Sequence, residues 1–101
     1  MIKLTGFADE AGGEVAEQIR AHKCLGWDSI EMRLVKTCDK SKNFAELNEA
    51  EYRKVREELA AAKIGVSCFG SAIANWSRKI TNPFQQDLDD LKRAAPRMRE
   101  L

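Results

Sequence analysis

The chain has 101 residues, of which 44% are hydrophobic and 33% charged, and its formal net charge is +1 at pH 7. This length is enough for one small domain with a modest core, and the near-neutral charge gives no support for broad electrostatic binding to nucleic acid or to a membrane. No apolar run approaches the roughly 20 residues that span a bilayer, and we expect no leader peptide, so the expected location is cytoplasmic.

The three cysteines are consistent with a reducing compartment. Cys24, Cys38 and Cys68 are odd in number and form no CxxC pair, so we expect no disulfide framework. Cys68 falls in a predicted strand and Cys24 near a predicted helix end, which favours a core position for both. Cys38 stands between Thr37 and Asp39 and is expected at the surface.

The first predicted unit is a strand over residues 2–7 followed by a helix over residues 14–25. The strand shows period-two alternation, and Gly26 stops the helix. His22, the only histidine, is expected on the helix surface. Asp9 and Glu10 lie in the turn between the two elements, where they either favour the helix N-terminus electrostatically or contact a substrate.

The second predicted strand, residues 28–34, has one apolar face and one polar face. One face is Ile30, Met32 and Leu34, and the other is Ser29, Glu31 and Arg33. Parallel strands normally read as near-continuous apolar runs, so a face with Glu31 and Arg33 must point to a polar space. The inward positions at the end of a βα-barrel strand line the active site. The alternatives are an edge strand with a solvated face and an internal ion pair.

A loop is predicted for residues 35–45, followed by a second helix that starts near Asn48. Asn48 and Glu51 have the spacing of a capping box. The helix then carries one apolar stripe at helical spacing. The stripe consists of Tyr52, Val55, Leu59 and Ala62.

The third unit is a predicted strand over residues 64–70, a loop over residues 71–82 and a third helix. Trp76 in this loop is either a ligand platform or a cover for the rim of the domain. Asn82 and Pro83 are typical of a helix start, and Pro96 predicts a kink or an end near residue 95. The apolar stripe of this helix is Phe84, Leu88, Leu91, Ala95 and Met98.

Strand–helix alternation predicts an α/β protein with parallel βαβαβα units in a single domain, residues 1–101. A nucleotide-binding sheet is poorly supported, because the sequence contains neither GxGxxG nor GxxxxGK[ST]. A (β/α)8 barrel usually needs about 250 residues, so three units would be the N-terminal three-eighths of one.

Four segments resemble a known family. They are residues 6–10 (GFADE), 25–33 (LGWDSIEMR), 70–73 (GSAI) and 80–84 (ITNPF). In order and spacing they look like the N-terminal part of sugar phosphate isomerases/epimerases of the xylose-isomerase-like TIM barrel superfamily. The resemblance covers essentially the whole chain.

The resemblance implies a metal-dependent isomerase or epimerase that moves a proton next to the carbonyl of a sugar or sugar phosphate. In the family, the catalytic residues and the ligands of the divalent metal (Mn, Mg, Co or Zn) come from later strands. They are therefore expected beyond residue 101, and the chain alone is expected to be inactive.

The resemblance also assigns part of the substrate site. Phe7 matches the end of strand one and is expected to wall the sugar. Glu31 matches the acid at the end of strand two, and Ser71 matches the small polar residue at the end of strand three. With Arg33 and Trp76, these residues form the predicted substrate-binding set.

Two other functions are consistent with parts of the sequence. One is a non-enzymatic small-molecule-binding or assembly module that self-associates through open sheet edges. The other is an abasic-site nuclease of the endonuclease IV type, from the same superfamily. That branch usually has a metal-binding histidine at or just after strand three, where this chain has Ser71, so no nucleic-acid partner is expected.

Overall fold

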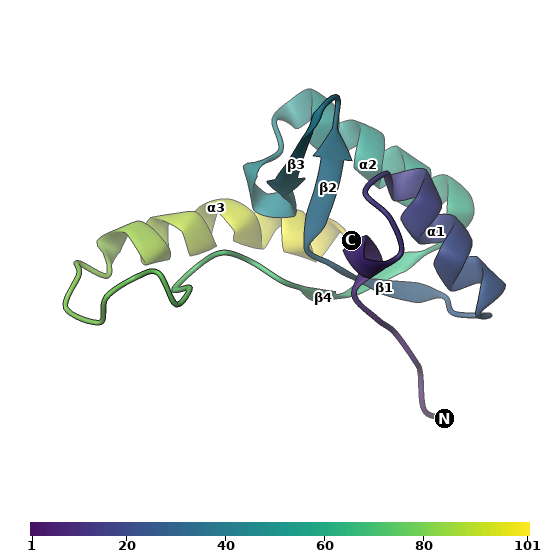
Figure 1. The fold of residues 1–101 in the computed structure, drawn as a ribbon, viewed down its shortest axis with the longest axis horizontal. Coiled ribbons are helices and arrows are strands. Elements are labelled where there is room, and N and C mark those ends of the chain that lie inside the picture. Colours follow the sequence, from purple (N-terminus) through teal and green to yellow (C-terminus); the bar gives the residue numbers. More distant parts are fainter.

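A parallel strand pair lies at the centre of the fold. The computed structural model describes residues 1–101 as an α/β domain with three helices (Figure 1). Strands β1 (Ser29–Met32) and β4 (Gly65–Phe69) pair in parallel, with a register shift between Ile30 and Glu31. None of the helices is long and apolar enough to cross a bilayer. The predicted α/β class with a parallel crossover is confirmed.

Residues 5–7 lie along the other edge of β1. Phe7 forms one isolated parallel bridge with Glu31, and the Glu31 amide donates to the Gly6 carbonyl over 2.9 Å. The predicted strand over residues 2–7 is therefore wrong as a regular strand. Its outer edge has no partner, and Met1, Ile2 and Leu4 are exposed, so too few backbone hydrogen bonds form to define a ladder.

An antiparallel hairpin replaces the predicted loop at residues 35–45. It comprises β2 (Leu34–Thr37) and β3 (Lys40–Asn43), with Leu34 opposite Asn43. Cys38 occupies the turn with a φ of 53°. The predicted strand 28–34 accordingly ends at Met32, and Leu34 belongs to β2. The sequence did not predict this hairpin because its outer face is solvated and carries lysines in both strands, so no apolar alternation indicated a strand.

The first two helices follow the sequence signals closely. Helix α1 (Val15–Cys24) ends before Gly26, whose φ is +74°. Helix α2 (Glu49–Ala62) starts with the predicted capping box: the Asn48 side chain accepts from the Glu51 amide over 2.9 Å, and the Glu51 carboxylate accepts from the Asn48 amide over 2.9 Å. Satisfying these otherwise unpaired donors defines the helix start.

The core lies between the parallel strands, the hairpin and helices α1 and α2. Its buried members are Ala8, Val15, Ile30, Met32, Val35, Phe44, Leu47, Tyr52, Val55, Leu59 and Ile64. Phe44 belongs to the short 3-10 helix η2 (Phe44–Glu46). Ile30 and Met32 thus face the helices, as predicted for one side of this strand.

His22 is buried, so its predicted place on the helix surface is wrong. Its Nδ1 lies 2.9 Å from the Gln18 carbonyl and its Nε2 lies 3.2 Å from the Gly6 carbonyl. The ring packs edge-on against Trp27, with centroids 5.5 Å apart. Residues 5–7 cover this part of α1 after pairing with β1, which the helix periodicity alone could not reveal.

All three cysteines are exposed and free. The predicted core positions of Cys24 and Cys68 are therefore wrong, while the surface position of Cys38 is confirmed. Cys68 is the partner of Glu31 in the register of the parallel pair. Paired residues share a face, so Cys68 lies on the side of the sheet opposite Ile30 and Met32.

Helix α3 (Gln85–Glu100) differs from its prediction at both ends. It begins after Phe84, with no side-chain cap, so Asn82 and Pro83 precede the helix instead of starting it. It also continues through Pro96 to Glu100. Of the two predicted outcomes near residue 95, a kink or an end of the helix, the end is therefore wrong. Contacts hold this last part in place: Arg97 donates to the Leu47 carbonyl and to Glu49.

The C-terminal turn of α3 is joined to α2 through Tyr52. The Tyr52 hydroxyl donates to the Glu100 carboxylate, and the Arg97 guanidinium lies 4.6 Å from the centre of the Tyr52 ring. Burial, together with the hydrogen bond to Glu100, raises the pKa of Tyr52 to about 12. The folded state therefore favours the neutral phenol.

We expect this pKa to produce a loss of stability at alkaline pH. The unfolded chain releases the phenolic proton near pH 10, so the stabilisation is complete below that pH and is lost as the pH rises towards about 12. Its loss should lower the free energy of unfolding by about 2 kcal/mol. Urea unfolding at a series of alkaline pH values measures this loss of stability.

Tyr52→Phe is the control, because it removes the phenol and leaves the other titrating groups in place. Its free energy of unfolding should therefore lack the part of the pH dependence that comes from Tyr52. If both proteins lose stability equally between pH 10 and pH 12, the loss does not come from Tyr52.

Candidate functional site at the carboxyl edge of the sheet

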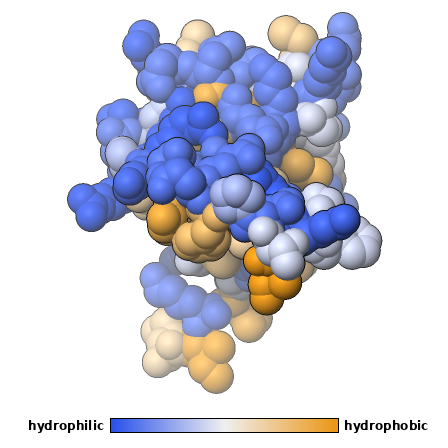
Figure 2. Space-filling model, turned by 90° about the vertical axis from the view of Figure 1, so that its left-hand side faces the viewer, coloured by the Kyte–Doolittle hydropathy of each residue, from blue (hydrophilic) through white to orange (hydrophobic).

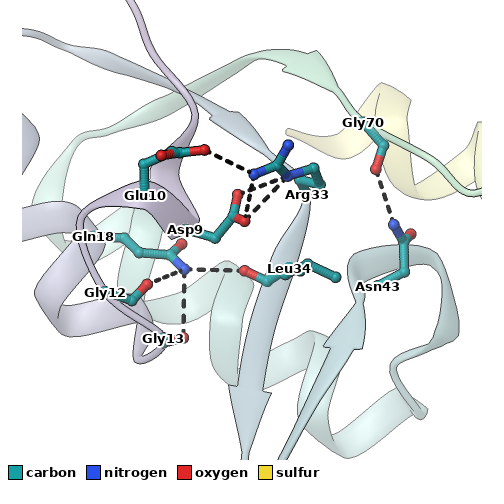
Figure 3. Close-up of polar contacts among 9 residues, drawn as sticks. All are labelled: Asp9, Glu10, Gly12, Gly13, Gln18, Arg33, Leu34, Asn43 and Gly70. Atoms are coloured by element: carbon teal, nitrogen blue, oxygen red, sulfur yellow. Dashed lines mark hydrogen bonds and ion pairs between the residues drawn. The ribbon is translucent and has the colours of Figure 1, made fainter.

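Arg33 organises a charged cluster where β1 ends. Its Nε lies 3.1 Å from each Asp9 carboxylate oxygen, and its Nη2 donates to Asp9 Oδ2 over 2.8 Å and to Glu10 Oε1 over 3.2 Å (Figure 3). The guanidinium also lies 4.6 Å from the centre of the Phe7 ring. A planar guanidinium suits this combination of a forked carboxylate contact and an aromatic face.

The two acids reach Arg33 because of the chain's path after Phe7. Phe7 pairs with Glu31, and the chain then turns through the 3-10 helix η1 (Ala8–Glu10), whose Ala8 is fully buried. The prediction for Asp9 and Glu10 left a helix-terminus role and a substrate contact open. In the structure, both acids pair with Arg33.

Gln18 holds the loop that follows these acids. Its Nε2 donates to the carbonyls of Gly12 and Leu34, each over 3.0 Å, and lies 3.4 Å from the Gly13 carbonyl (Figure 3). Gln18 is fully buried. It therefore ties the loop carrying Asp9 to the segment that follows Arg33, and it is a positioning residue for the cluster.

The sequence analysis did not identify Gln18 as part of the site, although its position along α1 indicated that it could be buried. Val15, Gln18 and His22 have helical spacing and are all buried, so a polar residue on the inner face of α1 was visible. Gly12 fits the same loop because its φ is +156° and a Cβ there would lie 2.6 Å from the Glu17 carboxylate. A side chain at this position would be strained in both respects.

The end of β4 is held beside Arg33. The Asn43 side-chain amide donates to the Gly70 carbonyl over 2.9 Å (Figure 3), and the Gly70 amide donates to the Met32 carbonyl over 2.9 Å. A Cβ on Gly70 would lie only 3.2 Å from Arg33 Cγ. Gly70 therefore packs against the Arg33 side chain, and Ser71 is the next residue along the chain.

The cluster carries two carboxylates and one guanidinium. Hydrogen bonding to Asp9 raises the pKa of Arg33, against the opposing effect of desolvation, so the guanidinium remains charged at every physiological pH. It can donate hydrogen bonds, and the carboxylates can accept them. This is a donor–acceptor surface suited to a polyhydroxyl ligand.

The structure brings together part of the predicted substrate-binding set. Phe7 and Arg33 are in contact, and Glu31 pairs with Phe7 on the same side of the sheet. Ser71 is exposed, and its hydroxyl accepts from the Ile73 amide over 3.3 Å. Trp76 is fully exposed in the loop of residues 70–84, which extends away from the sheet (Figure 1), and the structure does not place it at the cluster.

A divalent metal does not fit the residues of this cluster. Asp9 and Glu10 both face the Arg33 guanidinium, which would repel a cation. No group of three or more His, Cys, Asp or Glu side chains in the chain is arranged to hold a metal ion. The charges of the cluster therefore compensate one another within the chain.

Comparison with known proteins identifies no relative: no family model, no curated protein and no solved structure matches the chain. The class that fold and site define is an α/β domain whose parallel strands end in an Arg–carboxylate cluster.

Proposed function

We propose that the chain forms the first three βα units of a xylose-isomerase-like (β/α)8 barrel, and that the complete barrel is a metal-dependent isomerase or epimerase of a sugar or sugar phosphate. One observation carries the proposal. Residues 5–7, β1 and β4 lie side by side in chain order, all parallel, and α1 and α2, which connect them, pack in one core. This is the arrangement of consecutive barrel strands.

The polar face of the sheet supports a sugar ligand. The hydroxyls of Thr5 and Ser67 lie 2.9 Å apart, and the Ser67 hydroxyl also donates to the Ile30 carbonyl over 3.1 Å. Glu31 and Phe7 share this face by their pairing. In a barrel it would face the interior, where hydroxyl, carboxylate and aromatic groups suit a sugar, because each buried sugar hydroxyl needs a partner.

Each residue then has a role in binding. Phe7 walls one face of the sugar ring, while Arg33 donates to its hydroxyl or phosphate oxygens. Asp9 and Glu10 orient Arg33, and Glu31 accepts a hydrogen bond from a sugar hydroxyl. The proton transfer itself and the metal that polarises the carbonyl belong, as the resemblance implies, to strands outside residues 1–101.

Binding to the isolated chain tests this proposal. In an NMR titration with an aldose, a ketose and their phosphates, we expect amide shifts concentrated at Phe7, Glu31, Arg33 and Ser71. Arg33→Lys keeps the charge but loses the forked geometry, so it should weaken binding about tenfold. Lys54→Gln on the exposed face of α2 is the matched control and should bind as the original chain does.

Three results would count against the proposal. If no sugar shifts the amide resonances at the carboxyl edge of the sheet, the chain has no sugar-binding site there. Equal shifts with inorganic phosphate and with every sugar phosphate would leave only a general anion site. Turnover of a ketose by residues 1–101 alone would contradict the assignment of the chemistry to other strands.

A further inference from the structure

A cavity lies between the first turn of α1, strand β2 and the neighbouring face of α2. Its volume is about 260 Å³, and each of the three elements supplies one apolar side chain to it, namely Val15, Val35 and Val55. All three valines belong to the core. Neither edge of the parallel sheet contributes to the walls, so the cavity does not depend on what adjoins those edges.

A hydrogen bond and an ion pair hold the three walls in fixed positions. The Lys36 amide donates to the Gly13 carbonyl over 2.9 Å, which fixes β2 against the start of α1. The Lys42 ammonium donates to the Glu51 carboxylate over 2.7 Å, which fixes the hairpin against α2. The cavity is therefore formed before any ligand arrives, as small-molecule sites usually are.

Charged groups of both signs surround the apolar floor. Lys36 Nζ lies 3.7 Å from Glu14 Oε1, and Lys54 Nζ lies 3.9 Å from Glu58 Oε1. Both separations are longer than a hydrogen bond, so these ammonium and carboxylate groups can still bond to a ligand. In Figure 2 the upper part of the molecule, where the hairpin lies, is also largely hydrophilic.

The Thr37 hydroxyl is a free polar group at the cavity wall. Its oxygen is buried and has no hydrogen-bond partner. Hydrogen bonds from Lys42 and from the Asn48 amide lower the pKa of the nearby Glu51, with a smaller contribution from Thr37, so this carboxylate is satisfied without the hydroxyl. A buried hydroxyl without a partner is costly, and a donor on a ligand would remove that cost.

We propose that this cavity binds a small aliphatic α-amino acid, such as leucine or valine, in its zwitterionic form. The three valines contact the aliphatic side chain. The Thr37 oxygen and a rim carboxylate accept hydrogen bonds from the ammonium group of the ligand, and Lys36 and Lys54 donate to its carboxylate. The inference does not depend on the proposed enzymatic function, because the cavity shares no residue with the Arg33 cluster.

The size and the charges of the cavity define this class of ligand. Sites for drug-sized ligands measure roughly 300–1,000 Å³, so this smaller cavity suits a ligand with few non-hydrogen atoms. A monocarboxylate would be attracted by the rim lysines but repelled by the rim glutamates, and a monoamine would meet the opposite pattern. A zwitterion presents one charge to each sign.

An NMR titration of the chain with L-leucine tests the proposal. Saturable shifts should appear at the methyl groups of Val15, Val35 and Val55. We expect a Kd of about 1 mM, because a ligand of about nine non-hydrogen atoms provides limited binding energy. Isocaproate lacks the ammonium group of leucine and isopentylamine lacks its carboxylate, so each should bind about tenfold more weakly.

Two variants separate binding from a structural role. Thr37→Val removes the hydroxyl at nearly constant shape. It should weaken leucine binding about tenfold without lowering stability, because the hydroxyl has no partner to lose. Lys54→Gln should weaken leucine binding about tenfold but should not weaken the binding of isopentylamine, which has no carboxylate. Arg53→Gln is the matched control, because Arg53 is exposed on α2 and lies outside the cavity.

Circular dichroism verifies the fold of each variant. A folded original chain whose three valines show no shift up to about 20 mM leucine would overturn the proposal. Equal affinity for leucine and isocaproate would also overturn it, because the cavity would then be only an apolar crevice. So would undiminished leucine binding by both Thr37→Val and Lys54→Gln, which would place the ligand elsewhere. The sugar titration is a separate readout, since Arg33→Lys should bind leucine as the original chain does.

Discussion

Replacing Phe44 by alanine should cost about 3–5 kcal/mol of folding stability, the usual range for a fully buried phenylalanine. Phe44 is 0% exposed. Its ring centre lies 5.7 Å from that of Tyr52 and 5.1 Å from that of Phe69, so it joins η2 to both α2 and β4. The cavity left by the substitution would open at the junction of these elements. Chemical denaturation of Phe44→Ala against the original chain measures the loss.

Phe84→Ala is the matched control for this prediction. Phe84 undergoes the same chemical change but is 61% exposed before α3, so its loss should alter stability by less than about 0.5 kcal/mol. Equal effects of the two substitutions would mean that the packing of Phe44 does not stabilise the fold.

Gln18→Leu should cost about 2–4 kcal/mol, because it removes a buried donor from two carbonyls without changing the side-chain size greatly. The Gly12 and Leu34 carbonyls would lose the partner they now have at 3.0 Å. The Gly13 carbonyl would keep the Lys36 amide, at 2.9 Å. The change should also loosen the loop that brings Asp9 to Arg33, so the Arg33 Nε–H resonance should shift towards that of a solvated arginine.

The exposed Gln86 on α3 provides the control. Gln86→Leu makes the same change where no buried carbonyl depends on it, so neither stability nor the Arg33 resonance should change. A stable Gln18→Leu protein with an unchanged Arg33 signal would show that Gln18 does not position the cluster.

Local rules predicted the elements whose signals lie within a few residues. The Asn48–Glu51 capping box marks the start of α2, and Gly26 marks the end of α1. Strand 64–70 corresponds to β4. In each case, propensity and hydrogen-bond partners agree within one segment, so no distant contact was needed.

Part of the site was also predicted from a local pattern, the alternation of residues along one strand. Arg33 and Glu31 stood out because a polar face on a parallel strand needs a polar space. Phe7 came from the family resemblance, and the structure places it against Arg33. The contact of Arg33 with Asp9 joins residues 24 positions apart, and no periodicity specifies such a distance.

The amino-acid sequence alone determined the α/β class, the capped helix α2 and the polar face of β1, because these depend on periodicity and local capping. Tertiary structure decided the burial of His22 and Gln18, the hairpin β2–β3 and the pairing of Arg33 with Asp9 and Glu10. Each of these depends on segments that meet only after folding. A polar side chain becomes buried when a distant backbone carbonyl satisfies it, and the residues adjacent to it in sequence do not encode that partner.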